Sequence, residues 1–466
     1  MRNFASPRIY NLFPRLLGTI ENWDRYLKKI VNMGFNWVFV NPVNFTGFSG
    51  SLYSIKDYFR LNPLFAIDEA DEISWESLKN FFITKCHANG LKFMIDIVFN
   101  HTAIDSPLIS EHPSWFKKKW VVIEKSSGYK IKFFEKDEKP TEKEYPSEKY
   151  GIKWQIANPY AINPENADEI QIWGDLAEID YNSPDVDSII DYWKKLFDFY
   201  DVLGIDGYRV DAAYQVPSKI WKELLSYVKN NNPKAIFYAE TLGATLKQYD
   251  SLSDANFDYI ACSSKWWDYT APWLLDQYNK YRKFAPSISF PENHDTVRVA
   301  FETDGRQDIQ KFKYFFASFF SAGVIMPLGY EFGYKTKIDV VNSSPSDLEM
   351  PRFDISEFIL AVNKFKQKFR CLNEDGEIIH YEYPDLGLLF LKKCSIDNNQ
   401  QILLIYNKDW RNSHHIDIPD LGKYLDYSDS IFQIDLNGKK TEISDFQLNR
   451  ELKPIEFLIY YQSKNI

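Results

Sequence analysis

Four short apolar segments of this 466-residue chain each end in polar residues of the kinds that carry out acid–base chemistry. Each segment contributes a carboxylate, two contribute a histidine and one contributes an arginine. The candidate residues are Asp96, Asn100 and His101 in DIVFNH, Arg209 and Asp211 in GYRVD, Glu240 in YAET, and His294 and Asp295 in ENHD.

Two of these carboxylates have neighbours that suit different tasks. Because side chains alternate along a strand, Arg209 and Asp211 face the same side. A guanidinium beside a carboxylate favours the ionised form, which a nucleophile needs. Glu240 follows the apolar residues Phe237, Tyr238 and Ala239, and apolar surroundings raise the pKa of a carboxyl group so that it can donate a proton. Two such carboxyl groups flanking a bond, with histidines to hold hydroxyl groups, form the arrangement used for glycoside hydrolysis.

The elements that must position these residues alternate between short apolar strands and amphipathic helices. The sequence predicts strands at residues 8–13, 36–41, 91–98, 205–211, 235–240, 257–262, 287–290 and 324–328. Eight strand–helix units predict a (β/α)₈ TIM barrel, in which residues at the carboxyl ends of the strands line one mouth. Ahead of the third strand, Ser74 is the expected N-cap of a helix that turns Leu78, Phe81 and Phe82 inward.

Two regions break this alternation. Residues 101–181 are charged and turn-rich, which predicts a subdomain inserted after the third strand, called subdomain B below. After about residue 370, strand-like segments separated by turns predict a C-terminal antiparallel β domain. The expected domains are a catalytic barrel of residues 1–100 and 182–370, subdomain B of residues 101–181, and a C-terminal β-sandwich of residues 371–466.

Composition excludes several classes of protein. The net charge is −10, from 55 basic and 65 acidic residues, which argues against the basic face of a nucleic-acid binder. The four cysteines form no CxxC pair, so we expect reduced thiols. Neither a membrane-spanning stretch nor the apolar core of a Sec signal is visible, so we expect a cytoplasmic protein with no membrane partner. Export by a specialised non-Sec system is the alternative.

The four segments listed first resemble the conserved regions of the α-amylase family of glycoside hydrolases. DIVFNH resembles the first region, GYRVD the second, the glutamate of YAET the third and ENHD the fourth. The segment GSLYSIKDYFRLNP also resembles the Tyr–x₃–Asp–Tyr stretch that follows the second strand of that family. The resemblance covers residues 8–333, and it implies an α-glucan as the partner of this chain.

The resemblance implies a catalytic role for three residues. Asp211 is expected to be the nucleophile that forms a covalent β-glucosyl intermediate. Glu240 is expected to act first as general acid and then as general base. Asp295 is expected to bind sugar hydroxyls and favour the distorted transition state. The expected outcome is retention of the α-anomer.

The resemblance also implies a set of residues that surround the sugar. Arg209 is expected to hold Asp211 ionised, and Asp96 to position its neighbours. The remaining expected contacts are a ring stacked on the sugar from Tyr53, hydrogen bonds from His101 and His294, and a contact with the next sugar from Arg298.

The chain departs from the family at its calcium site. Many members carry a Lys–His pair shortly after the nucleophile, where this chain reads Ala213-Tyr214-Gln215. The family's calcium site uses that histidine, the asparagine of the first region and an aspartate of the inserted subdomain. Asn100 is present, but subdomain B offers only Glu178 or Asp180 near the expected position. We therefore expect no required cofactor, and calcium bound through Asn100 is the alternative.

The motifs are compatible with two reactions, hydrolysis and transfer to phosphate. RIYNLFP and PLGYEFG resemble the branch of the family whose maltosyltransferases act with phosphate on α-1,4-glucan. Those enzymes carry an extra N-terminal β domain, whereas this chain begins at the barrel, so we expect hydrolysis.

The prediction is a retaining hydrolase that cleaves the α-1,4-glucosidic bonds of glycogen, starch or maltodextrin. One alternative is a maltosyl- or glucanotransferase that uses the same site with phosphate or a glucan as acceptor. The other is a non-catalytic glycan-binding protein, a class that typically loses members of the carboxylate set. No nucleic-acid partner is expected, and no oligomeric state is predicted.

Overall fold

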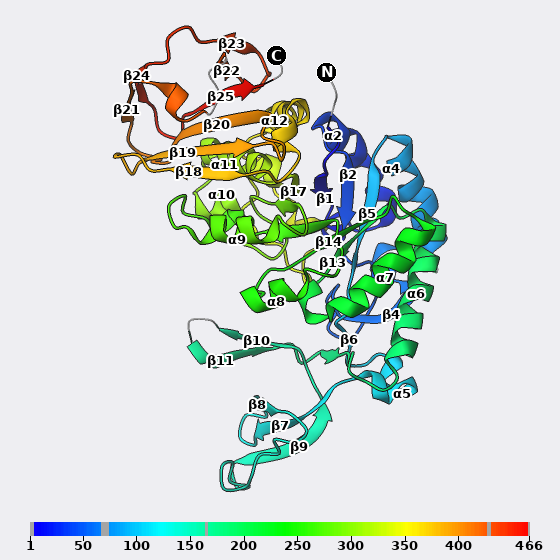
Figure 1. Cartoon of the computed structure of the whole chain (residues 1–466). Helices are drawn as coiled ribbons and strands as arrows, with labels where there is room; N and C mark the ends of the chain where they lie inside the picture. The colour runs from blue at the N-terminus through cyan, green and yellow to red at the C-terminus, as the bar shows by residue number, and fades with distance from the viewer. Residues whose placement is uncertain (1–3, 67–73, 164–165, 426–429, 465–466) are drawn as a thin grey trace.

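The centre of the molecule is a closed barrel of eight parallel strands (Figure 1). The computed structural model describes residues 4–66, 74–163, 166–425 and 430–464. The barrel strands are β1 (Arg8–Asn11), β2 (Trp37–Val40), β5 (Lys92–Ile97), β13 (Gly207–Val210), β14 (Ile236–Ala239), β15 (Tyr259–Cys262), β16 (Ser287–Ser289) and β17 (Gly323–Pro327). Each strand pairs in parallel with the next one along the chain, and β17 closes onto β1. The prediction of a (β/α)₈ barrel is confirmed.

Helices cover the outside of the barrel because each buries one apolar stripe against the strands. On α6, for example, Ile189, Trp193 and Leu196 are all buried, and Gly204 ends the helix in the left-handed conformation with φ 84°. The main helices are α2 (Leu27–Asn32), α6 (Val186–Leu203), α7 (Ser218–Asn231), α8 (Leu246–Ser251), α9 (Trp273–Tyr281), α11 (Gln307–Phe320) and α12 (Ser356–Lys368).

The helix ahead of β5 contains an irregularity that the sequence did not predict. Ser74 caps it as expected, accepting a hydrogen bond from the Ser77 N–H. A π-helical turn at Lys79–Ile83 then joins α3 (Trp75–Leu78) to α4 (Thr84–Ala88). Because a π turn widens the spacing of residues, Phe82 is buried but Phe81 is 41% exposed. The prediction that Phe81 faces inward is therefore wrong.

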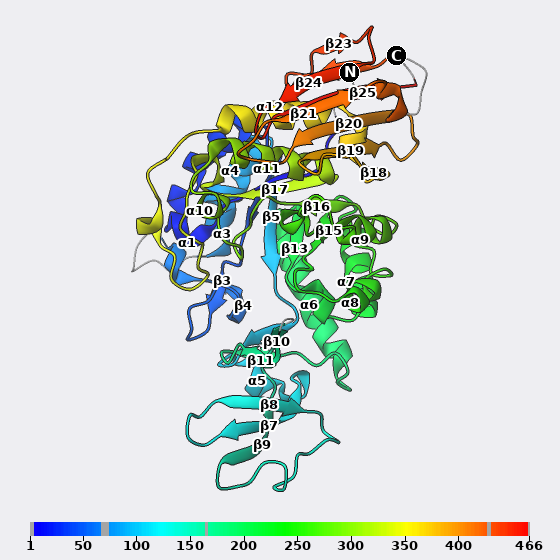
Figure 2. The same ribbon diagram turned by 90° about the vertical axis from the view of Figure 1, so that its left-hand side faces the viewer.

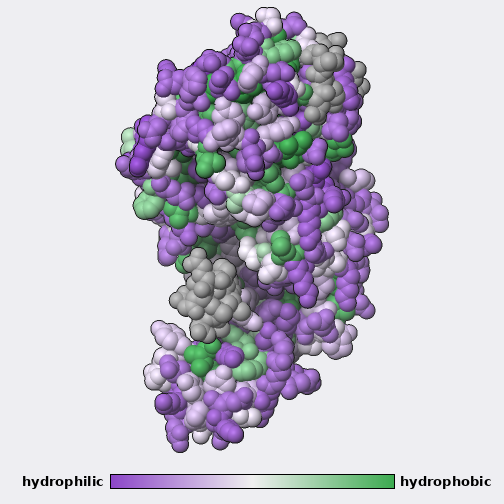
Figure 3. All heavy atoms as spheres, turned by 60° about the vertical axis from the view of Figure 1, so that its left-hand side comes forward, coloured by the Kyte–Doolittle hydropathy of each residue, from purple (hydrophilic) through white to green (hydrophobic). Residues whose placement is uncertain are grey.

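Subdomain B follows β5 and projects from the end of the barrel opposite the C-terminal sheets (Figures 1 and 2). Its sheets are antiparallel. They consist of β8-β7-β9 (Lys130–Phe134, Lys118–Glu124, Tyr150–Ile156), β10-β11 (Tyr160–Asn163, Asn166–Ile172) and β12-β6 (Leu176–Glu178, His101–Ala103). Figure 3 shows the surface hollowed between subdomain B and the body of the molecule.

The C-terminal part is antiparallel, as predicted. Its larger sheet has the order β18 (Ile378–Tyr381), β19 (Leu388–Cys394), β20 (Gln400–Asn407), β25 (Phe457–Ser463), β22 (Phe432–Ile434) and β23 (Lys440–Glu442). A buried cluster that includes Phe390 and Ile416 lies between this sheet and the pair β21 (His414–Ile418) and β24 (Leu448–Leu452). The opposite face packs on α11, where the rings of Phe312 and Tyr406 stack with centroids 3.4 Å apart.

The structure also bears on the expected reduced thiols and on the expectation that no segment spans a membrane. All four cysteines are buried, and each is a thiol rather than part of a disulfide. Within the described ranges, every helix is too short or too polar to cross a membrane.

Candidate active site

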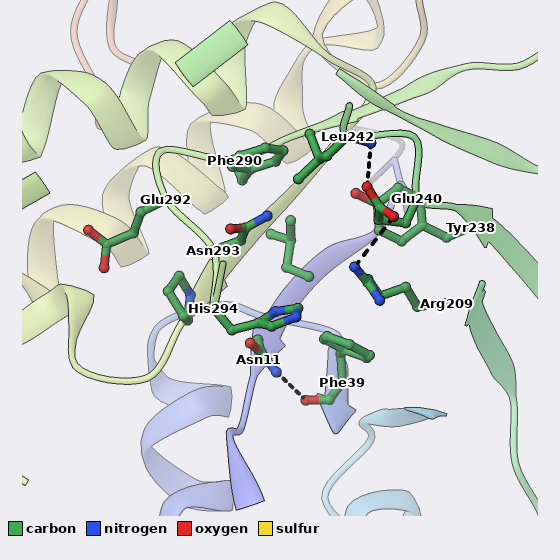
Figure 4. A pocket seen from close by; sticks show the side chains of 12 residues that line it. Asn11, Phe39, Arg209, Tyr238, Glu240, Leu242, Phe290, Glu292, Asn293 and His294 are labelled. Carbon is green, nitrogen blue, oxygen red and sulfur yellow. Dashed lines mark hydrogen bonds and ion pairs between the residues drawn. The ribbon is translucent and has the colours of Figure 1, made fainter. Parts of the chain in front are cut away.

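The carboxyl ends of the barrel strands bring together most of the residues singled out in the sequence. A pocket at this end is lined by Arg209, Glu240 and His294, together with apolar side chains such as Phe39 and Phe290 (Figure 4). These residues come from β2, β13, β14, β16 and the loops that follow them, so the barrel topology places them at one mouth.

Arg209 is the cation around which the carboxylates gather. Its Nη1 donates to Asp96 Oδ2 at 2.6 Å and to Asp211 Oδ1 at 3.2 Å. Its Nη2 lies 4.0 Å from Glu240 Oε2. Burial alone lowers the pKa of Arg209, but Asp96 and the other carboxylates raise it well above its ordinary value. One guanidinium therefore links the predicted nucleophile to the predicted proton donor.

Asp211 lies beside this guanidinium with 17% of its side chain exposed. Burial raises the pKa of Asp211, whereas Arg209 and His101 oppose the shift. Arg209 alone was expected to act on Asp211, but burial has the larger effect on the pKa of this carboxyl group. Arg209, whose guanidinium stays charged, is the main group that favours the ionised form of this carboxylate.

Glu240 is 7% exposed, and its carboxyl group is held by two backbone N–H groups. Oε2 accepts from Ala212 N at 3.0 Å, and Oε1 accepts from Leu242 N. Ala212 has φ 41°, in the left-handed region. Burial raises the pKa of Glu240 to about 7; Arg209 opposes this shift, whereas Asp211 and Asp295 add to it. A group with this pKa carries a proton that it can donate near neutral pH.

Tyr53 joins the two predicted histidines to the charged cluster. Its hydroxyl donates to Asp96 Oδ2 at 2.8 Å and lies 2.6 Å from His294 Nε2. The rings of Tyr53 and His294 are parallel, with centroids 5.7 Å apart. His101 Nε2 lies 3.1 Å from the Tyr53 carbonyl oxygen. Burial lowers the pKa of His294 to about 4, so this ring is neutral near pH 7.

Asp295 is the most open of the three predicted catalytic carboxylates, with 51% of its side chain exposed. Its Oδ2 lies 3.2 Å from His294 Nε2. This position leaves the carboxylate accessible to a hydroxyl group of a ligand.

Arg298 does not lie where the sequence prediction placed it. Its guanidinium is 1% exposed and donates to Glu292 Oε1 at 2.7 Å. It also donates to the backbone carbonyls of Leu328 and Thr336. In Figure 4 the Glu292 side chain points away from Glu240. The expectation that Arg298 reaches the next sugar is therefore corrected, because the buried pair with Glu292 holds it inside the protein.

Two asparagines at the mouth were missed in the sequence. Asn11 ends β1 in NLFP, Asn41 directly follows β2 in NPV, and both are buried. Asn41 Nδ2 donates to the Tyr53 hydroxyl at 2.9 Å. Both amides stand at strand ends, as the carboxylates do, but an amide carries no charge, so residue type alone did not indicate a role for them.

The structure describes the surroundings of Asn100, the residue through which calcium is the alternative. Calcium takes about six to eight oxygen ligands. Asn100 Oδ1 is buried and has no hydrogen-bond partner among the described residues. The Glu178 carboxylate is already paired with the Lys117 ammonium group. No group of three His, Cys, Asp or Glu side chains in the described ranges is arranged to hold a metal.

Comparisons with known proteins agree with the motifs. Residues 3–116 match the family model of the glycogen debranching enzyme glucanotransferase domain. An alpha-1,4-glucan:maltose-1-phosphate maltosyltransferase of Burkholderia pseudomallei is 21% identical over 413 residues, which is 86% of this chain and 33% of that protein. An intracellular maltogenic amylase of Bacillus subtilis is 24% identical over 232 residues, 48% of this chain and 31% of that protein. The chain spans about a third of the length of each relative.

The fold of this chain also resembles that of a solved structure. The α-amylase from Geobacillus thermoleovorans, complexed with acarbose, superposes with a TM-score of 0.71 at 16% identity, covering 100% of both chains. The resemblance to the α-amylase family that the four strand-end motifs predict is thus confirmed, and the chain has the fold of that family.

Proposed function

We propose that this chain is a retaining glycoside hydrolase that cleaves α-1,4-glucosidic bonds of glycogen, starch or maltodextrin. The observation that carries the proposal is the placement of Asp211 and Glu240 on one buried guanidinium, with the pKa of Glu240 raised to about 7. One carboxyl group is thereby prepared to donate a proton while its neighbour attacks.

The proposed reaction has two steps. In the first, Glu240 gives its proton to the glycosidic oxygen while Asp211 forms a bond to the anomeric carbon, which releases the leaving sugar. In the second, the Glu240 carboxylate takes a proton from water, and this water displaces Asp211 from the same carbon. Two displacements at one carbon retain the α configuration. Neutral His294 and the exposed Asp295 carboxylate are placed to hold sugar hydroxyls.

Transfer to phosphate or to another glucan is the second candidate. It is favoured by the match of residues 3–116 to a glucanotransferase domain and by the long alignment with a maltosyltransferase. The same carboxyl groups serve this reaction, with the acceptor in place of water. The relative named as intracellular supports a cytoplasmic location for either activity.

Proton NMR of the products tests the proposal directly. Purified protein is incubated with glycogen and with maltoheptaose, with and without inorganic phosphate. We expect reducing ends that appear first as the α-anomer at a rate that phosphate does not change. A maltose 1-phosphate signal that requires phosphate would instead establish the transferase.

The Asp211→Asn variant is the control, because it keeps the shape of the side chain and removes the nucleophile. We expect loss of activity by more than about 10³-fold. Nearly unchanged activity would contradict the role of Asp211, and no activity in the natural protein would favour a binding protein.

A further inference from the structure

We propose that Trp266 binds a sugar ring of the α-glucan on the leaving-group side of Glu240, and that the same indole ring holds the acceptor when a glucan takes the place of water. This inference rests on the proposed function and deepens it, because it names the side chain that recognises the leaving chain. Binding of a glucan to Trp266 can still be measured without turnover.

Trp266 is the most exposed tryptophan of the chain. It is 50% exposed, whereas its neighbour Trp267 is 3% exposed and donates from Nε1 to the Ala271 carbonyl at 2.7 Å. A single exposed apolar side chain is common on protein surfaces. What distinguishes Trp266 is the rigidity of its support and its position at the mouth of the barrel.

The residues that precede Trp266 are fixed by buried contacts. Ser264 is buried, and its hydroxyl donates to Ser289 Oγ of β16 at 2.9 Å. Lys265 is buried as well, and its Nζ donates to the Val297 carbonyl at 3.4 Å, in the loop that follows β16. An aromatic ring on a fixed backbone loses little freedom when it binds a ligand, which favours affinity.

The Trp266 ring stands beside the pocket that contains Glu240. It meets the Phe290 ring edge to face, with centroids 5.7 Å apart and an interplanar angle of 86°. Phe290 lines this pocket together with Glu240 and Leu242 (Figure 4). Because Phe290 is 1% exposed and Trp266 is half exposed, Trp266 extends the apolar wall of the pocket toward solvent.

The order of the strands puts Trp266 on the side of Glu240 that is remote from Tyr53. In the closed barrel, β15 lies between β14, which Glu240 follows, and β16, which Asp295 follows. β2 lies four strands from β15 in both directions, and the connection after β2 carries Tyr53, which is expected to stack on the sugar that is attacked. Glu240 gives its proton to the oxygen that joins this sugar to the leaving chain. The leaving chain therefore extends away from Tyr53, toward Trp266.

The chemistry of an indole ring suits a sugar. A glucose ring presents C–H groups on its faces and hydroxyl groups at its edge, so stacking on Trp266 removes apolar surface of both partners from water. The indole N–H is a donor that matches a hydroxyl group. In the second step, an acceptor sugar stacked on Trp266 lies where Glu240 can take its proton, and it competes with water for the covalent intermediate.

Two substrates isolate this subsite. Maltoheptaose places sugars on the leaving-group side, whereas α-maltosyl fluoride places only fluoride there. We expect Trp266→Ala to lower kcat/KM on maltoheptaose by about 10- to 30-fold and to change kcat/KM on the fluoride by less than about twofold. Trp266→Phe keeps an aromatic face and should lose less than about threefold on maltoheptaose. An equal loss on both substrates, or no loss on maltoheptaose, would overturn the inference.

The acceptor role has its own measurement. α-Maltosyl fluoride is supplied with maltose below saturation, and chromatography separates the products of transfer from those of hydrolysis. Trp266→Ala is expected to lower the ratio of transfer to hydrolysis by about tenfold, because the acceptor loses its stacking surface while water does not. An unchanged ratio, or a natural protein that transfers nothing to maltose, would contradict the acceptor role.

Trp410→Ala is the matched control. Trp410 is 40% exposed and follows β20 in the C-terminal part, where its ring lies beside the guanidinium groups of Arg306 and Arg411. The substitution removes an equally large exposed ring, and we expect unchanged kinetics on both substrates. Urea unfolding of both alanine variants shows whether either has lost stability. A Trp410→Ala variant with the same selective loss on maltoheptaose would show that the effect is not specific to Trp266.

Binding without turnover separates this inference from the proposed function. Calorimetric titration with maltoheptaose compares Asp211→Asn with the double variant Asp211→Asn, Trp266→Ala. We expect the Kd to rise by about tenfold when Trp266 is removed. A natural protein that is inactive on every glucan and on the fluoride would refute the proposed function and leave the titration to decide the role of Trp266. An equal Kd in the two variants, or no binding to either, would refute that role.

Discussion

Among single residues, Glu240 controls the pH dependence of the proposed reaction. Its pKa of about 7 in the folded protein means that it loses its proton as the pH rises through neutrality. We therefore expect kcat/KM on maltoheptaose to fall about tenfold per pH unit on the alkaline side. The acid limb follows protonation of Asp211, whose pKa is raised by burial, so it should lie higher than for an ordinary aspartate. Initial rates measured across the pH range check both limbs.

The same residue allows a sharper comparison of two substrates. Glu240→Gln removes the proton that a sugar leaving group needs, whereas the fluoride of α-maltosyl fluoride leaves without one. The variant is expected to lose about 10²- to 10⁴-fold on maltoheptaose and far less in the first step with the fluoride. Asp211→Asn, as the control, should lose both. Equal losses on the two substrates in Glu240→Gln would show that this residue is not the acid.

Among the elements, the loop ahead of β18 closes the end of the barrel remote from the mouth. Asp375 accepts hydrogen bonds from the N–H and hydroxyl of Ser287, both at 2.6 Å, and from Ala322 N at 2.7 Å. Ser287 begins β16, and Ala322 immediately precedes β17. Lys393 Nζ lies 3.8 Å from the same buried carboxylate. One side chain of the C-terminal part thus fixes the start of two barrel strands.

Asp375→Ala is expected to lower the free energy of unfolding by about 3 kcal/mol, because it leaves two buried backbone N–H groups without their acceptor and the buried Lys393 ammonium without its counter-ion. Urea unfolding measures this loss. The kcat should stay unchanged, since catalysis is expected at the opposite end of the strands. The control Asp397→Ala removes an exposed partner of Arg370 and should have a much smaller effect. A large fall in kcat without loss of stability would contradict this division.

For the whole molecule, the packing predicts cooperative unfolding. Side chains of the barrel helices and of the C-terminal sheet belong to one buried apolar cluster, joined by contacts such as the stacked rings of Phe315 and Phe457, 4.5 Å apart. Twelve of the thirteen tryptophans precede residue 371, so fluorescence reports mainly on the barrel and subdomain B. We expect its transition to coincide with loss of amide protection in β19 and β20. A separate, earlier opening of these strands would indicate independent domains.

The sequence predicted the barrel because its signals are local. Short apolar runs bounded by turn residues fall within two residues of each observed strand, and the strand-end rule predicted that Asp211 and Glu240 share one mouth, where both lie beside Arg209. Two features escaped because distant residues decide them. Arg298 is held by Glu292 and by carbonyls of a later loop, which its spacing does not reveal. The π-helical turn before β5 breaks the helical period that placed Phe81 inward.

The separation of the two ends of the strands also has an evolutionary consequence. Groups that hold the molecule together, such as Asp375, contact the beginnings of strands, whereas the charged cluster around Arg209 lies at their carboxyl ends. Substitutions near the beginnings of the strands can therefore stabilise the protein without altering the residues at the carboxyl ends. The added stability allows destabilising substitutions at the carboxyl ends of the strands, and such substitutions can change the preferred acceptor or glucan chain length. Proteins with this barrel can therefore diverge in the reaction they catalyse while the contacts at the beginnings of the strands stay the same.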